Sequence, residues 1–91
     1  MSEVSRTIEH NAVCKELNEL YSRKNHDYGD SFHETYKKYG LTMSAIRLGD
    51  KLSRFESLLQ KGQQVKDESI RDTLVDLANY AIMTIMELDR G

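Results

Sequence analysis

Charged side chains recur at helical spacing in two segments of this sequence. The segment from 42 to 61 places four of them at i, i+3, i+4 and i+7 on one helix face: Arg47, Asp50, Lys51 and Arg54. The segment from 68 to 89 carries a second stripe of polar residues: Glu68, Asp72, Asp76 and Asn79. Carboxylates one helical turn apart are oxygen ligands for Mg²⁺, and basic side chains bind phosphate. The pattern raises the hypothesis of a site for a phosphate-bearing ligand.

The far end of the acidic stripe runs into apolar sequence, which surrounds Asp76 and Asn79. A buried carboxylate is costly unless it meets a cation, a metal or several donors, so we expect both residues to be partly buried beside such partners. Two interpretations stay open. In one, Arg47 and Arg54 form interhelical salt bridges with the acidic stripe, each contributing about 0–1 kcal/mol. In the other, the two stripes line a pocket in which carboxylates hold Mg²⁺ and cations meet phosphate.

An earlier connection, RKNHDYGDSF at residues 23–32, holds more functional groups than a helix connection needs. We assign Lys24 and Asp27 to chemistry or ligand binding, and Tyr28 and Gly29 to the shape of the site. An aromatic residue in such a place more often packs than stacks on a ligand. Beside the basic stripe and Asp76, this connection is predicted to form the third wall of one polar pocket.

The elements that position these residues are predicted to be helices throughout. Helical periodicity covers residues 7–24, 42–61 and 68–89. A short helix of about two turns is predicted between the first two, with Ser31 and Glu34 as a capping box and Gly40 at its end. Gly62 is a stop signal, and Asp67 is an expected N-cap of the last helix. The predicted fold class is all-α, a single helical domain over residues 1–91.

Two apolar stripes are predicted to form the core. One belongs to the middle long helix: Ala45, Leu48, Leu52, Phe55 and Leu59. The other belongs to the last helix: Ile70, Leu74, Leu77, Ala81, Ile85 and Leu88. From 77 to 86 the last helix is apolar nearly all the way round, so a single partner face cannot cover it. We therefore expect bundle packing that is completed by homo-oligomerisation, as a dimer or a tetramer.

The composition narrows the classes of partner. The chain has 91 residues, with 13 basic and 15 acidic side chains and a net charge of −2. This balance gives no overall field to attract nucleic acid or an anionic membrane, although local basic stripes leave nucleic acid open. A single cysteine and no apolar run of membrane length lead us to expect a cytoplasmic protein with no membrane partner.

Three ordered motifs carry a resemblance to a known family: KNHDYGDSF, RLGDKLSR and ESIRDTLVDLANYAIM. Together they resemble the phage and prophage family DUF1599, also called nucleotide modification associated domain 1, over roughly residues 24–87. The resemblance implies a role associated with phage nucleotide or DNA modification.

A more distant similarity is to the MazG-like all-α nucleoside triphosphate pyrophosphohydrolases, in which acidic helices bind Mg²⁺ and cleavage falls between the α and β phosphates. Asp76 is similar to the aspartate of their Glu-x-x-Asp helix, but Thr73 stands where the glutamate is expected and Asp72 lies one residue earlier. Lys51 and Arg54 occupy places where further acids are expected. These departures imply either a rearranged site that also draws on Asp27 and Asp50, or a fold that binds ligands without hydrolysis.

The leading hypothesis is a nucleotide-handling domain, in its catalytic form a Mg²⁺-dependent (d)NTP pyrophosphohydrolase. The candidate metal and catalytic residues are Asp50, Asp72 and Asp76. The candidate substrate-binding residues are Lys24, Asp27, Tyr28, Arg47, Lys51, Arg54 and Asn79. Phosphoanhydride cleavage needs mainly a metal, cations and a positioned water. The alternatives are a non-catalytic module that binds nucleotide, nucleic acid or protein, and a purely structural helical oligomer.

Overall fold

A computed structural model describes residues 2–26, 28–61 and 67–91, the side chains of 67 and 68 excepted. These residues form four α-helices and no strand: α1 (Glu3–Lys24), α2 (Gly29–Tyr39), α3 (Leu41–Gln60) and α4 (Asp67–Arg90). The all-α prediction is confirmed. Asp27 and Gly62 lie outside the described residues.

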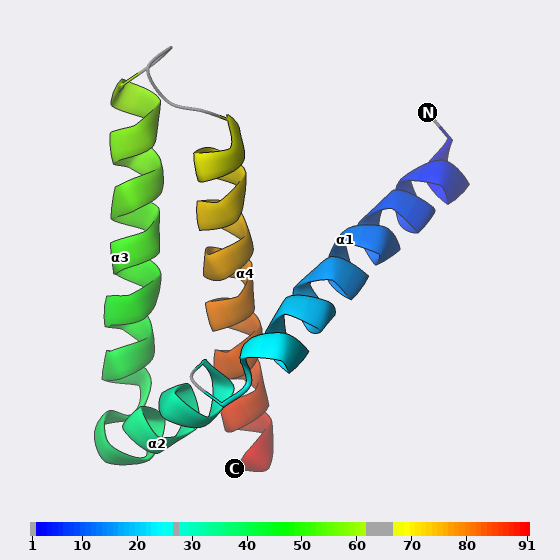
Figure 1. Ribbon diagram of the computed structural model, residues 1–91. Helices are drawn as coiled ribbons and strands as arrows, with labels where there is room; N and C mark the ends of the chain where they lie inside the picture. Colours follow the sequence, from blue (N-terminus) through cyan, green and yellow to red (C-terminus); the bar gives the residue numbers. More distant parts are fainter. Residues whose placement is uncertain (1, 27, 62–66) are drawn as a thin grey trace.

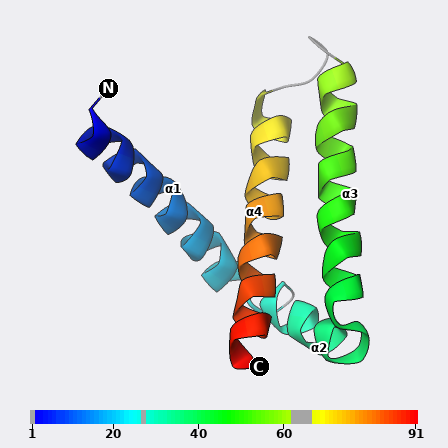
Figure 2. The same ribbon diagram turned by 180° about the vertical axis from the view of Figure 1, so that it is seen from behind.

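Helices α3 and α4 stand side by side as an antiparallel hairpin (Figure 1). Helix α2 crosses one end of this hairpin, and α1 leans away from it, so that the N-terminal half of α1 projects from the molecule (Figures 1 and 2). The C-terminal half of α1 contacts α4, where Arg71 donates to both oxygens of Glu16 at 2.6 and 2.7 Å.

Local signals explain most helix ends, and two predictions about them are wrong. Gly40 has φ of 62°, a value that favours glycine, and it separates α2 from α3 as expected. The Ser31–Glu34 capping box is absent, because α2 begins at Gly29 and runs for 11 residues, which puts Ser31 inside its first turn. Asp67 is the first residue of α4 and not the residue before it.

Gly29, at the start of α2, lies close to two side chains. A Cβ atom at Gly29 would lie 2.4 Å from Oδ1 of Asn25 and 2.8 Å from the hydroxyl oxygen of Tyr21, both far below ordinary contact. A larger residue at this position would therefore displace the Asn25 and Tyr21 side chains. This supports the prediction that Gly29 determines shape.

The buried core gathers where α2 meets the hairpin. Phe32, Met43 and Met83 form the buried cluster. Four partly buried side chains pack against it: Tyr28, Tyr36, Tyr80 and Met86. Leu17 of α1 and Leu58 near the far end of α3 are also buried. Burying a side chain of this size contributes about 1.5–3 kcal/mol.

The predicted core stripes are wrong as a description of the monomer's interior. Five of their residues are exposed leucines or isoleucines: Leu52, Leu59, Leu74, Ile85 and Leu88. Ala45 is exposed as well, while Leu48, Phe55, Ile70, Leu77 and Ala81 are half-buried. The periodicity correctly identified an apolar face of each helix, but periodicity does not say which surface covers that face.

The contact between α3 and α4 uses neighbouring and more polar positions. Ser44 and Thr84 are buried there, and the Thr84 hydroxyl donates to Ser44 Oγ at 3.0 Å. Thr73 is also buried, and its hydroxyl donates to the Ser69 carbonyl oxygen at 2.8 Å. Small side chains allow the two helices to approach closely, so this contact leaves the larger apolar residues outside. In the part of the chain that the structure describes, no helix is long and apolar enough to cross a membrane.

Candidate ligand site beside the hairpin

Asp76 of α4 is the centre of a cluster that draws on three helices and the turn before α2. Its Oδ2 lies 3.3 Å from Nζ of Lys51 on α3, and its Oδ1 accepts a hydrogen bond of 3.4 Å from the Tyr28 hydroxyl. The Asp76 side chain is 32% exposed, so the carboxylate keeps access to solvent. The expectation that Asp76 is partly buried beside a cation is confirmed.

Tyr80 completes the cluster and was missed by the sequence reasoning. Its ring centroid lies 5.5 Å from that of Tyr28 and 5.9 Å from that of Phe32. Nζ of Lys51 lies 5.9 Å from the Tyr80 centroid, within the range of a cation–π contact. The signal was available, because Tyr80 stands four residues after Asp76 and so shares its helix face.

A cavity of about 370 Å³ opens at this cluster, lined by Lys24, Tyr28, Asp76 and Tyr80. We call these four residues and Lys51 the polar site. They combine two ammonium groups, one carboxylate and two aromatic rings. This is the chemistry that binds a ligand with both a negatively charged part and a planar part.

The polar site holds the Tyr28 hydroxyl in its protonated form. Burial raises the pKa of Tyr28, and the nearby Asp76 carboxylate and Tyr80 raise it further. The side-chain amide of Asn79 acts in the opposite direction but does not reverse the rise in pKa. Tyr28 therefore serves as a hydrogen-bond donor and as packing surface at neutral pH, not as a base.

Asn79 is buried, as the sequence predicts, and is only 3% exposed. Its Nδ2 donates to the carbonyl oxygen of Leu17 at 3.3 Å. This bond ties α1 to α4 directly behind the polar site. In this arrangement Asn79 fixes the helices that carry the site.

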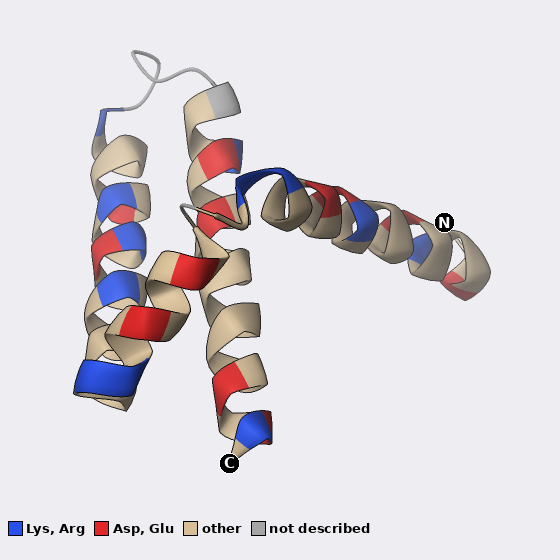
Figure 3. Cartoon of the chain, turned by 60° about the horizontal axis from the view of Figure 1, so that its bottom comes forward, with Lys and Arg blue, Asp and Glu red and all other residues tan. Residues whose placement is uncertain are grey.

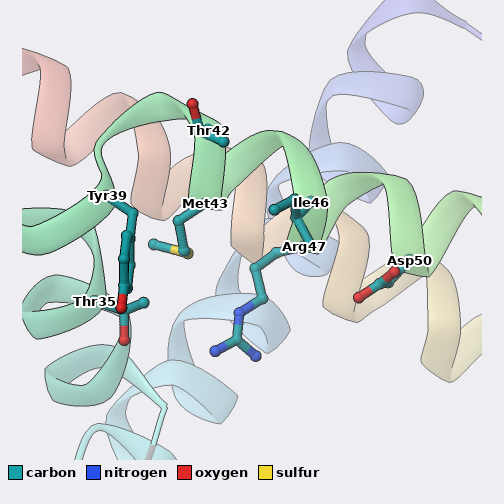
Figure 4. A pocket seen from close by; sticks show the side chains of 7 residues that line it. All are labelled: Thr35, Tyr39, Thr42, Met43, Ile46, Arg47 and Asp50. Carbon is teal, nitrogen blue, oxygen red and sulfur yellow. The ribbon is translucent and has the colours of Figure 1, made fainter.

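Arg47 and Asp50 line a separate cavity of about 400 Å³ at the corner between α2 and α3, with Tyr39 on its other side (Figure 4). Met43 and Ile46 supply apolar surface between them. Neither Arg47 nor Asp50 is among the residues that line the cavity at Asp76. The predicted single pocket is two cavities in the structure.

Arg54 and Asp72 are exposed, and within the described side chains neither forms an ion pair. Figure 3 shows basic and acidic residues interleaved along α3, while α4 carries no charged residue between Asp76 and Glu87. Among the described residues, the salt bridge that joins α3 to α4 is Lys51–Asp76, so the predicted pairing of the two stripes holds for one pair and with a different cation.

Asp50, Asp72 and Asp76 are not brought together in the monomer. Among the described residues, no group of three His, Cys, Asp or Glu side chains lies close enough to hold a metal ion. Of the carboxylates that the structure describes, Asp76 is the one that lines the cavity at the polar site. Mg²⁺ is commonly bound by one or two carboxylates together with substrate phosphates, so this donor set fits a metal that shares its ligands with a nucleotide.

A second buried carboxylate lies on the opposite side of α2. Glu87 is almost buried, and its Oε1 lies 2.6 Å from Nδ1 of His33 and 3.6 Å from the Arg90 guanidinium. His33 is half-buried because of these contacts. These contacts fasten α2 to the end of α4 and keep the Tyr28 end of α2 in place.

The family comparison agrees with the motifs that surround this cluster. Residues 24–88 match the model of the family described as nucleotide modification associated domain 1, DUF1599. The chain belongs to this family. No curated protein and no solved structure matches it. The matched region includes every residue of the polar site, whereas most of α1 lies before it.

Proposed function

We propose that this chain is a nucleotide-handling domain that binds a nucleotide at the polar site. The observation that carries the proposal is the placement of Lys24 and Lys51 beside the paired rings of Tyr28 and Tyr80. Lysine ammonium groups bind phosphate, and an aromatic face stacks on a base. The family description, which names nucleotide modification, supports the same class of ligand.

Each residue of the site has a separate task in this proposal. Lys24 and Lys51 bind the phosphates, and the exposed edges of the two tyrosine rings contact the base. Asp76 orients Lys51 and Tyr28, because each of its oxygens contacts one of them. Arg54, one turn beyond Lys51 on α3, extends the positive charge toward a longer phosphate chain.

Equilibrium binding of a panel of NTPs and dNTPs tests this proposal. Lys51→Met is expected to weaken binding at least tenfold, because it removes a phosphate contact and leaves the Asp76 carboxylate unpaired. The matched control is Lys61→Met, at the exposed end of the same helix, which is expected to change affinity less than twofold. Equal losses in the two variants, or no binding by the unaltered protein, would contradict the proposal.

We propose as the second candidate a Mg²⁺-dependent (d)NTP pyrophosphohydrolase at the same site. The supporting observation is that the partly exposed Asp76 carboxylate lines the cavity, together with the motif similarity to MazG-like enzymes. A bound Mg²⁺ would supply charge stabilisation at the phosphates. The residues of this chain would hold the phosphate chain and exclude alternative orientations of it.

Pyrophosphate release from the same nucleotide panel, with Mg²⁺ or Mn²⁺, separates catalysis from binding. Asp76→Asn is expected to abolish release while the variant still folds, as judged by its helical circular dichroism. Nucleotide binding without any release would identify a non-catalytic binding module.

We propose that the working unit is a homo-oligomer, a dimer or a tetramer. The monomer exposes 6865 Å², whereas a compact monomer of 10.5 kDa exposes about 5,400 Å². Its radius of gyration is 14.9 Å, compared with about 12 Å for a compact domain of this length. The excess of roughly 1,400 Å² exceeds the roughly 800 Å² that each partner buries in a standard interface. A sedimentation mass near that of the monomer would contradict this proposal.

A further inference from the structure

An apolar stripe runs along α4, and at one end of it Leu74 and Ala78 line a cavity that they share with Val13 and Leu17 of α1. The stripe consists of Leu74, Ala78, Ala81, Ile85 and Leu88, at steps of four, three, four and three residues. Leu74, Ile85 and Leu88 are exposed, and the two alanines are half-buried. An apolar stripe at this spacing is typical of a helix that packs on another helix.

Helix α3 carries a matching stripe at intervals of seven residues: Ala45, Leu52 and Leu59, all exposed. In both helices the exposed residues directly follow residues of the α3–α4 contact. Leu52 follows Lys51 and Leu59 follows the buried Leu58, just as Leu74 follows Thr73 and Ile85 follows Thr84.

The two stripes lie on the same side of the hairpin. One residue forward along an α-helix is a rotation of about 100°. Because α3 and α4 run in opposite directions, the same rotation turns both stripes toward one side of their contact (Figure 1). Together they form one surface, the apolar face, with the exposed Glu56 at its edge, one turn from both Leu52 and Leu59.

The occupant of this face is a second copy of the chain, for three reasons. The excess surface of the monomer is more than the roughly 800 Å² that each partner buries in a standard interface. The seven-residue repeats in both helices suit four-helix packing, in which a hairpin of two helices is completed by another hairpin. A two-fold axis would bring the apolar face of each copy against the same face of the other, so that both apolar surfaces are buried in one interface.

We infer that two copies pack their apolar faces together into a four-helix core of two hairpins. This inference names the surface for the homo-oligomer proposed above and rests on it. The polar site lies on the other side of the α3–α4 contact, so each copy presents its own site outward.

The test is the sedimentation mass of Ile85→Glu and Leu52→Glu over a range of protein concentrations. Each variant is expected to raise the dissociation constant of the dimer at least 100-fold, because it places a carboxylate in the apolar face. The matched control is Ile46→Glu, since Ile46 is 59% exposed and Ile85 is 56% exposed, but Ile46 lies outside both stripes. The control is expected to sediment as the unaltered protein does.

Ile85→Ala keeps the test decisive if a glutamate prevents folding. It removes apolar contact without adding charge and is expected to weaken association at least tenfold with unchanged helical circular dichroism. A dimer unaffected by all three face variants, or disrupted only by Ile46→Glu, overturns the surface assignment and leaves the oligomer standing. A monomer at every concentration, or one that binds phosphatidylcholine vesicles through this face, overturns both.

Discussion

The two sides of the α3–α4 hairpin are built from positions one residue apart in the sequence. On α3, Asp50 precedes the contact residue Lys51 and lies on the charged side, whereas Leu52 follows it and lies on the apolar side. On α4, Asp72 and Leu74 stand in the same relation to the contact residue Thr73. The charged side carries α2 and two cavities, while the apolar side meets α1 at Leu74 and Ala78. A difference of one position along each helix thus separates the proposed ligand site from the surface proposed for a second copy.

The largest expected contrast comes from truncating one residue on each side. Phe32→Ala removes the centre of the cluster under α2 and is expected to lower the free energy of unfolding by about 3–5 kcal/mol at every protein concentration. Leu74→Ala is expected to lower it by an amount that grows with protein concentration, because its cost arises from association. Urea unfolding at two concentrations measures both.

If Leu74→Ala destabilises the monomer itself, the two variants will not differ in how their stability depends on protein concentration. In that case the unfolding midpoint of Leu74→Ala would shift by the same amount at high and low concentration, and the apolar side would be an ordinary exposed surface.

Salt is expected to act in opposite directions on the two sides. Raising the NaCl concentration should weaken nucleotide binding severalfold, because ions screen Lys24 and Lys51 from phosphate. Raising the sulfate concentration should tighten association, because excluded salts favour the burial of apolar surface. Affinity and sedimentation mass, each measured against salt, give the two slopes. Slopes of the same sign would mean that charge also governs the assembly.

The smallest expected effect concerns Tyr28 and alkaline pH. Tyr28→Phe removes a long hydrogen bond to Asp76 and is expected to cost about 0.5–1 kcal/mol at neutral pH. The raised pKa of Tyr28 means that the folded protein keeps this proton where the unfolded chain loses it, above about pH 10. Stability from Tyr28 is therefore complete below that pH and falls as the pH rises further.

Denaturant unfolding at neutral pH and above pH 10 follows this loss. The difference in stability between the unaltered protein and Tyr28→Phe is expected to shrink as the pH rises. A constant difference across that range would place the Tyr28 hydroxyl in contact with water and not with the cluster.

The sequence was sufficient for the helices and for the environment of Asp76, because both depend on local pattern. Residues 42–61 were expected as a helix, and α3 covers Leu41–Gln60. The partial burial of Asp76 and the burial of Asn79 followed from their apolar neighbours.

The rotation of each helix about its axis could not be read from the sequence. Asp50 and Lys51 were assigned to one site, yet a difference of one position is about 100° of rotation, so Lys51 points to Asp76 and Asp50 to the other cavity. The same uncertainty made an outer apolar face look like a core. Tyr80 was overlooked for a different reason: its role depends on Tyr28, which is distant in the chain.

The position of Lys51 links phosphate binding at the proposed site to the stability of the α3–α4 hairpin. Ser44, Lys51 and Leu58 form a seven-residue series along the contact of α3 with α4, so a cation stands between two buried residues of the seam. A phosphate that binds Lys51 adds a second anion to a cation already held by Asp76. If phosphate binds more tightly when α3 and α4 are packed together, then bound phosphate stabilises that packing by the same free energy. The protein would then melt at a higher temperature in the presence of its ligand, even though its main folding contacts lie elsewhere.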